Sequence, residues 1–296
     1  MMEMLMDKIL LPVEFPTTSL SVVRQAAFLA RHFNSEIILL HVVASMSYPV
    51  GMIELGYELT GGLHADVVKR AQVDLDQSLR QELDGIAVKR LLLNGDPARE
   101  IVRTARDEKV NLIMMSTHSH GVFYRFLLGS VAAKVLHDSD CSVWAEPYRE
   151  EAPAGEFAIR SVLCAVDLSH HSRNTVSRAA QIAAEFEARL TLVHITAGVE
   201  IYGPGGPRIF PKWKEELVGY AAKEIAKLQQ VGTKAEVIID SGDVHHLLNR
   251  AAEQSKCDLL VIGHFVIGHF PSGGHLGTTH CGYGIIRESH IPVLSV

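Results

Sequence analysis

The sequence is poor in features that define several large classes of protein. Only four of its 296 residues are cysteines, and none belongs to a Cys-x2-Cys pair: Cys141, Cys164, Cys257 and Cys281. Scattered thiols of this kind are usually reduced and packed as small core residues, which favours a cytoplasmic protein without disulfides. No apolar stretch approaches the roughly 18 residues of a membrane-spanning helix. The methionine-rich start carries Glu3 and lacks a basic segment, so it is a poor match to a signal peptide.

Concentrated positive charge and catalytic motifs are also missing. The formal net charge is −6, the isoelectric point is about 6.2, and lysine and arginine form no run. Nothing therefore predicts a nucleic-acid partner or binding to an anionic membrane. The sequence contains no Gly-x-Ser-x-Gly elbow, no His-Glu-x-x-His pair and no lysine-bearing Walker A loop. We therefore expect a binding protein rather than an enzyme, with a slow ATPase or phosphohydrolase as a minor alternative.

What the sequence does contain is one pattern that occurs twice. Two segments of the first half return 153 residues later, and two others return 147 residues later. The pairs are Lys8–Glu14 with Ser161–Asp167, Ile37–Val42 with Leu190–Ile195, Asn94–Asp96 with Ser241–Asp243, and Asn111–Met115 with Asp258–Ile262. Landmarks in the same order at nearly constant offsets indicate duplication, with a longer middle loop in the first copy. Two such copies predict two domains of roughly 145 residues.

Each copy alternates short apolar runs with amphipathic stretches. Continuous apolar runs suit parallel strands that are buried on both faces, and a stretch such as Ser21–Phe33 has one apolar side, as a helix on a sheet does. Asp96 followed by Pro97 predicts a helix N-cap with proline at the first helical position, and Asp243 predicts the matching cap. The alternation predicts an α/β fold: two tandem doubly wound, Rossmann-like domains with parallel sheets. Ligands are expected at the carboxyl ends of the central strands.

Composition sets the domain boundaries. The segment 149–158 is charged, contains Pro153 and Gly155, and lacks apolar periodicity, so it predicts a linker between domain 1 (1–148) and domain 2 (159–296). Two further irregular segments, Ser45–Leu63 and Ala197–Pro211, each follow the second strand of a copy. Either surface connections or flaps over a ligand site are expected there.

The most specific segment of the first copy lies between its fourth strand and its last helix. It runs from Met115 to Val131 and ends in Leu127-Leu-Gly-Ser-Val131. This segment resembles the phosphate loop of universal stress proteins, whose ATP-binding members carry Gly-x2-Gly-x9-Gly-Ser. On that spacing Gly129 and Ser130 match the final pair, whereas Ser116 and Ser119 stand at the two earlier glycine positions. Together with the strand ends, the resemblance covers nearly the whole chain.

A phosphate loop surrounds an anion with backbone N–H groups next to a helix N-terminus. Glycine allows positive φ and a close approach of the backbone, and a serine forced into positive φ costs about 1–3 kcal/mol. The first loop is therefore either a degraded phosphate cradle or a segment that mainly starts the helix.

The second copy departs from the family pattern in another way. Gly263 keeps the first glycine, Val266 occupies the second glycine position, and Gly268 follows two residues later. About three residues are inserted before the last helix, where Gly277 and Thr278 are candidates for the final Gly-Ser pair. This loop is glycine-rich, but its geometry cannot be the standard one.

The resemblance also assigns residues at the strand ends. ATP-binding members place an aspartate after the first strand, and Glu14 and Asp167 occupy that position. A carboxylate there would accept hydrogen bonds from ribose hydroxyls or an exocyclic amine, although Asp167 could instead cap the following helix. Val42 and Ile195 match the position whose backbone contacts adenine in the family.

The resemblance implies a stress-responsive cytoplasmic protein that binds an adenine nucleotide (ATP, ADP or AMP), with or without Mg²⁺, in at least one domain. Last strands pair across an interface in the family, so we expect a pseudo-dimer within the chain, with a homodimer of two chains as an alternative. Histidines gather with Cys281 at 264–281, which leaves open a zinc-type site. His245 and His246 are expected at the surface. The last alternative is an interaction scaffold without ligand.

Overall fold

The computed structural model describes residues 6–15, 19–44, 57–117, 128–147, 157–197, 201–203, 206–208, 211–229, 234–264 and 281–296. The chain divides into two compact units: Met1–Arg125 with Gly129–Phe157, and Phe126–Leu128 with Ala158–Val296. Within the described ranges, no helix is both long and apolar enough to cross a bilayer.

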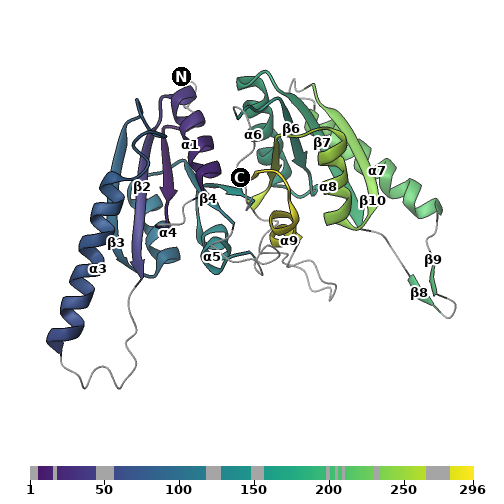
Figure 1. The fold of residues 1–296 in the computed structure, drawn as a ribbon. Coiled ribbons are helices and arrows are strands. Elements are labelled where there is room, and N and C mark those ends of the chain that lie inside the picture. The colour runs from purple at the N-terminus through teal and green to yellow at the C-terminus, as the bar shows by residue number, and fades with distance from the viewer. Residues whose placement is uncertain are drawn as a thin grey trace. The chain divides into compact units, whose positions relative to one another are not determined.

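The first unit is a parallel sheet whose strands alternate with helices (Figure 1). In sheet order its strands are β3 (Val88–Gly95), β2 (Glu36–Ala44), β1 (Lys8–Pro12), β4 (Leu112–Ser116) and β5 (Ser142–Glu146). Its helices are α1 (Leu20–Phe33), α3 (Tyr57–Gln77), α4 (Pro97–Asp107) and α5 (Ser130–Asp138). The strand order reverses between β1 and β4, which is where a doubly wound sheet opens a crevice for ligands.

The second unit repeats this topology (Figure 1). Its strands, in sheet order, are β10 (Glu236–Gly242), β7 (Arg189–Ala197), β6 (Ser161–Ala165), β11 (Leu259–Ile262) and β12 (Val293–Ser295). Its helices are α6 (Ser172–Glu185), α7 (Pro211–Gln229), α8 (Val244–Gln254) and α9 (Cys281–Glu288). The predicted duplication and the predicted parallel α/β fold are both confirmed.

The two irregular segments contain more structure than expected. α3 already begins at Tyr57, inside the stretch 45–63 that was expected to be a connection. In the other copy β8 (Ile201–Gly203) and β9 (Gly206–Arg208) pair as an antiparallel ribbon, in which Gly203 lies opposite Gly206. Glycine and proline are disfavoured in a helix or a central strand, but a short two-stranded ribbon tolerates them.

The core follows the apolar patterns read from the sequence. Ile9, Leu10 and Leu11 of β1 are fully buried, as are Ile37 to Leu40 of β2. The predicted helix caps are also confirmed: Asp96 accepts a hydrogen bond from Arg99 N (2.9 Å) and Asp243 accepts one from His246 N (2.8 Å). Both acids therefore satisfy an amide of the first helical turn.

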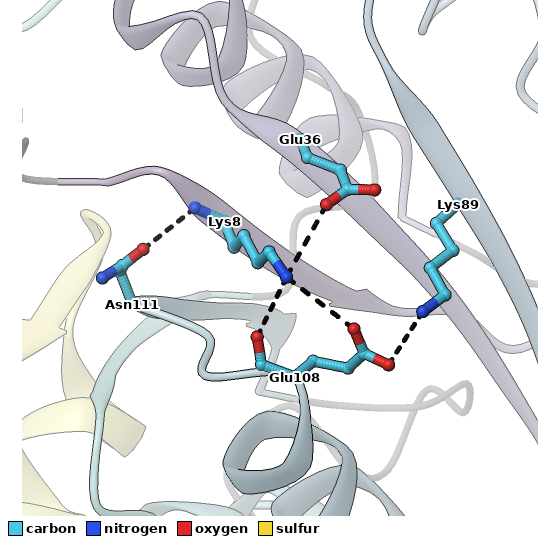
Figure 2. A network of polar contacts seen from close by, with 5 residues as sticks. All are labelled: Lys8, Glu36, Lys89, Glu108 and Asn111. Atoms are coloured by element: carbon cyan, nitrogen blue, oxygen red, sulfur yellow. Dashed lines mark hydrogen bonds and ion pairs between the residues drawn. The ribbon is translucent and has the colours of Figure 1, made fainter.

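A network of polar contacts lies at the amino edge of the first sheet, where its strands begin (Figure 2). The main-chain N–H of Lys8 donates to Asn111 Oδ1 (2.9 Å), and the Lys8 ammonium donates to the carbonyl of Glu108 (3.1 Å), the C-cap residue of α4. The Glu108 carboxylate lies 2.8 Å from Lys89 Nζ, and the same Lys8 ammonium lies 3.9 Å from Glu36. The neighbouring lysines lower the pKa of Glu108. β1, β2, β3 and the end of α4 are thereby joined.

The second copy builds the same junction from different residues. Asp258 stands where Asn111 does, and one of its oxygens accepts from the main-chain N–H of Arg160 (2.7 Å) and Ser161 (3.0 Å). The carbonyl of Ser255, the C-cap residue of α8, accepts from Arg189 (3.3 Å). A cation on a helix C-terminus is favourable in both copies because it lies at the negative end of the helix dipole.

Replacing Asn111 with alanine should therefore loosen the start of β1. Loss of one hydrogen bond to a backbone N–H costs about 1 kcal/mol, roughly a fivefold increase in local opening. Hydrogen exchange of peptides covering β1 measures this, and β6 in the same molecule serves as the internal control because its bond comes from Asp258. Equal protection of β1 in the variant and the parent would contradict the role assigned to Asn111.

Cys164 provides a test of core burial. It is fully buried in β6, and burial, with a smaller effect of Asp167, raises the pKa of its thiol to about 12. Burial also raises the pKa of Cys141 and Cys257, and all three thiols are free. Only the thiolate reacts, so at pH 8 Cys164 should be modified about 10⁴-fold more slowly than a thiol with a pKa near 8, until the protein unfolds. Peptide mapping after alkylation, with and without urea, measures this; rapid modification of Cys164 in the folded protein would contradict it.

Candidate functional site

The candidate residues of the first copy gather at the carboxyl edge of its sheet. Glu14 follows β1, Val42 lies near the end of β2, and Ser116 is the final residue of β4. Gly129 and Ser130 are the N-cap and first residue of α5. Parallel strands bring these ends to one edge, so the structure places all of the described candidates of this copy where a ligand is expected. Ser119 lies outside the described residues.

Gly129 lies close to the backbone of Thr117. Its N–H donates to the carbonyl of Thr117 (2.9 Å), and a Cβ at position 129 would lie 3.2 Å from that same oxygen. The φ of Gly129 is −58°, so glycine is needed here for proximity and not for a left-handed backbone. Gly129 has no side chain with which to cap α5, so within the described part of the chain the first-turn amides of this helix are available to solvent or an anion.

Ser116 is a correction to the sequence reading. A serine at a glycine position was expected to carry a cost for positive φ, but Ser116 pairs with Glu146 as part of the β4–β5 ladder and has no positive φ. The next residue, Thr117, continues this pairing through its N–H to the carbonyl of Glu146 (2.9 Å). The serine therefore costs nothing in backbone strain, because the strand extends through that position.

In the second copy, Asp167 is held by its own loop. Its Oδ1 accepts from the N–H of Ser169 (3.0 Å) and from the hydroxyl of Ser172 (2.6 Å), the first residue of α6. The N-cap of α6 is His171, so Asp167 fixes the turn before the helix without capping a helical amide. Among the described residues nothing bonds its Oδ2. The carboxylate is therefore oriented by one oxygen and can accept from a ligand through the other.

The residue after Asp167 carries strain. Leu168 has a φ of +60°, a left-handed conformation that costs an ordinary side chain about 1–2 kcal/mol. The two hydrogen bonds to Asp167 and the bond from His171 N to Ser169 Oγ (3.2 Å) hold this turn in place. Strained turns that are held in this manner are common at binding sites, where geometry matters more than stability.

Two of the other candidates of the second copy lie in the described part of the chain. Ile195 lies in β7, and Gly263 directly follows β11 and is buried. Gly268, Gly277 and Thr278 lie outside the described residues, as does the rest of the segment 265–280.

His245 corrects the expectation of a surface histidine. Its ring packs against Gly284 of α9 so closely that a Cβ at 284 would lie 2.2 Å from Cε1 of the imidazole. Its Nδ1 is buried and has no hydrogen-bond partner in the described part of the chain. His246, by contrast, is exposed as expected. The glycine at 284 makes room for the ring, a relation that no spacing in the sequence reveals.

The described residues offer no metal site. No group of three or more His, Cys, Asp or Glu side chains within the described ranges is arranged to hold a metal ion. His264 is engaged through Nδ1 with Ser295 Oγ (3.1 Å). The zinc hypothesis therefore depends on side chains of the segment 265–280 and on Cys281, whose side chain is not described.

Two histidines were missed as site residues. His41 Nδ1 lies 2.8 Å from the carbonyl of Val13, and His194 Nδ1 lies 2.6 Å from the carbonyl of Val166. Each carbonyl belongs to the residue before the candidate acid. The sequence contains a sign of this role, because both histidines recur at the same offset of 153 residues as the acids. That recurrence was used only to identify the repeat.

The chain belongs to the universal stress protein family, whose model matches residues 6–145 and again 158–296. Among relatives, it is 32% identical over 142 residues to the universal stress protein MJ0531 of Methanocaldococcus jannaschii, an alignment covering 48% of this chain and 82% of that protein. The universal stress protein YxiE of Bacillus subtilis is 25% identical over 142 residues, covering 46% of this chain and 96% of that protein. Both relatives therefore match about one of the two copies.

Solved structures match the tandem arrangement along nearly the whole chain. A functionally unknown protein of Pseudomonas aeruginosa superposes with a TM-score of 0.66 at 18% identity, covering 98% of this chain and 92% of that one. A universal stress protein of Archaeoglobus fulgidus gives 0.59 at 20% identity, covering 97% and 95%. At these identities the likeness establishes the fold of two universal stress protein domains.

Proposed function

We propose that this chain is a stress-responsive cytoplasmic binding protein that holds an adenine nucleotide (ATP, ADP or AMP) at the carboxyl edge of at least one domain, without dedicated catalysis. The observation that carries the proposal is the Asp167 carboxylate, whose Oδ1 is fixed by Ser169 and Ser172 while its Oδ2 has no partner among the described residues. It stands where ATP-binding members of the family place an aspartate.

In the first copy the support comes from the start of α5. The N–H of Gly129 donates to the Thr117 carbonyl, and Gly129 has no side chain to cap the helix, so the amides of the first turn are suited to a phosphate group. A triphosphate bound there would bring Mg²⁺ with it, as phosphate ligands usually do. Glu14 is exposed after the end of β1, and its carboxylate would accept hydrogen bonds from the ligand as that of Asp167 does in the second copy.

Calorimetric titration with Mg·ATP tests the proposal. One or two sites per chain are expected, and Asp167→Asn should raise Kd by about 10- to 100-fold at one of them, because hydrogen bonds to a charged group are worth about 1.5–3 kcal/mol. Asp243→Asn is the matched control: it removes a carboxylate from the same edge while asparagine still caps α8. No heat with ATP, ADP or AMP, and no nucleotide in the purified protein, would favour the scaffold instead.

The proposal extends to partners and assembly. The two domains act as a pseudo-dimer within one chain, and light scattering separates this from a homodimer of two chains. Metal analysis of protein purified without an affinity tag tests the zinc alternative at 264–281.

A further inference from the structure

In both copies a histidine side chain continues the strand pairing by one hydrogen bond. The ladder between β6 and β7 ends with Ala165 opposite Val193, after which Val166 N donates to the Val193 carbonyl (2.9 Å). The next bond comes from a side chain: His194 Nδ1 lies 2.6 Å from the carbonyl of Val166. The histidine therefore holds β6 to β7 at the point where β6 leaves the sheet.

The first copy shows the same arrangement with the same spacing. β1 and β2 pair up to Pro12 and Leu40, Val13 N donates to the Leu40 carbonyl (2.8 Å), and His41 Nδ1 lies 2.8 Å from the carbonyl of Val13. Both histidines are half-buried. The recurrence of the contact in two copies with different neighbouring residues shows that it belongs to this edge of the fold and is not an accident of one loop.

The chemistry of this bond determines the tautomer. A carbonyl oxygen can only accept, so Nδ1 carries the proton in each histidine and donates it to the carbonyl. The donor at Nδ1 is present whether the ring is neutral or charged.

The carbonyl that each histidine holds is one peptide bond from the candidate acid. Because the peptide unit is planar, fixing the Val166 carbonyl also fixes the N–H of Asp167 and limits the direction in which its side chain leaves the strand. Ser169 and Ser172 then fix the carboxylate from the other side, and the strained Leu168 lies between these anchors. Each restraint limits one end of a short turn.

We propose that His194, and His41 in the first copy, are positioning residues that aim the carboxylates of Asp167 and Glu14 at the ligand. The inference rests on the proposed function, since it assigns these acids a ligand. In the first copy Phe15, the residue after Glu14, lies against the histidine with ring centroids 5.3 Å apart, so that loop is held by a ring contact as well. The second copy lacks this ring contact because Leu168 stands there, which makes His194 the cleaner target.

Three variants test the role of His194. His194→Leu keeps apolar volume but removes the donor, whereas His194→Asn places an amide N–H₂ near the position of Nδ1. With Mg·ATP as the probe, Leu should raise Kd at the affected site about tenfold, and Asn should restore most of the affinity. The double variant His194→Leu/Asp167→Asn should bind no more weakly than Asp167→Asn alone, because the histidine acts through the acid.

The outcomes separate this inference from the proposed function. Additive losses in the double variant, or equal effects of Leu and Asn, would overturn the positioning role while leaving nucleotide binding in place. If the parent protein binds none of ATP, ADP and AMP, the proposed function fails. Hydrogen exchange of the ligand-free protein then still tests the contact: peptides covering 166–170 should exchange faster in His194→Leu than in His194→Asn, and equal rates would overturn it.

Discussion

Replacing Gly284 with alanine should destabilise the second unit by about 2 kcal/mol, although alanine is normally the better helix residue. Gly284 lies in α9, and an added Cβ would meet the His245 ring at 2.2 Å from Cε1 and 2.9 Å from each nitrogen. The ring must leave its place between α8 and α9, and overpacking of this kind costs about 1–3 kcal/mol. Hydrogen exchange of α8 and α9 measures the loss.

Two further variants make the result specific. Gly219 lies in α7 with nothing within 4 Å of an added Cβ, so Gly219→Ala should stabilise its helix by about 0.5–1 kcal/mol. His245→Ala should rescue Gly284→Ala, because it removes the ring that the new methyl group meets. A Gly284→Ala variant that is as stable as the parent would show that the ring moves aside without cost. A double variant that is no more stable than Gly284→Ala would show that the loss does not come from the ring.

In the first copy an ion pair joins the corresponding helices, α4 and α5. Lys134 occupies the position that Gly284 has in the second copy, and its ammonium lies 3.4 Å from Asp96, the cap of α4. Hydrogen bonds from Arg99 N–H and Lys134 lower the pKa of Asp96. An exposed ion pair of this kind contributes little stability.

Periodicity and repetition were enough to predict the duplicated α/β fold. Apolar strand runs, the Asp96 and Asp243 caps and the reuse of segments at fixed offsets depend on local rules, and the structure follows them. The carboxyl edge was predicted for the same reason, since parallel strands all end there. What could not be predicted was which side chains touch: the His245 ring against Gly284, and the histidine donors on Val13 and Val166, are contacts between residues that are distant in the sequence.

Ser116 shows why the motif alone misled on strain. The family spacing marks a glycine position, but the spacing does not state how far β4 extends, and one more strand residue removes the need for positive φ. Gly129 shows a close approach of the backbone, one of the two reasons expected for glycine, and does not have the positive φ that was the other. Its role depends on the distance to the Thr117 carbonyl, which only the three-dimensional path of the chain determines.

Four buried polar side chains of the first unit are joined in a row by hydrogen bonds, and breaking this row should destabilise the unit. The Trp144 indole N–H donates to Gln25 Oε1 (2.7 Å), Gln25 Nε2 donates to Ser21 (3.3 Å), and the Ser21 hydroxyl donates to Glu146 (2.7 Å). All four side chains are buried. Gln25→Leu should destabilise the first unit by about 3 kcal/mol, because it leaves the indole N–H buried without an acceptor and removes a donor to Ser21.

The corresponding position of the second copy provides the control. Arg178 stands where Gln25 does and is exposed, and Leu294 stands where Trp144 does, so Arg178→Leu should change stability by less than about 0.5 kcal/mol. Trp144→Phe removes the unsatisfied donor and should recover part of the loss caused by Gln25→Leu. Hydrogen exchange of α1 and β5 measures these effects, and a loss in Gln25→Leu no larger than in Arg178→Leu would contradict them.

Backbone hydrogen bonds connect this row of side chains to the candidate ligand site of the first copy. The carbonyl of Glu146 accepts from Thr117 N, and the carbonyl of Thr117 accepts from Gly129 N, both at 2.9 Å. Loosening Glu146 by removing Gln25 should therefore also speed hydrogen exchange at the start of α5, whereas Arg178→Leu should leave α5 unchanged. An effect of Gln25→Leu that stops at α1 and β5 would mean that Glu146 anchors the core alone and does not support Gly129.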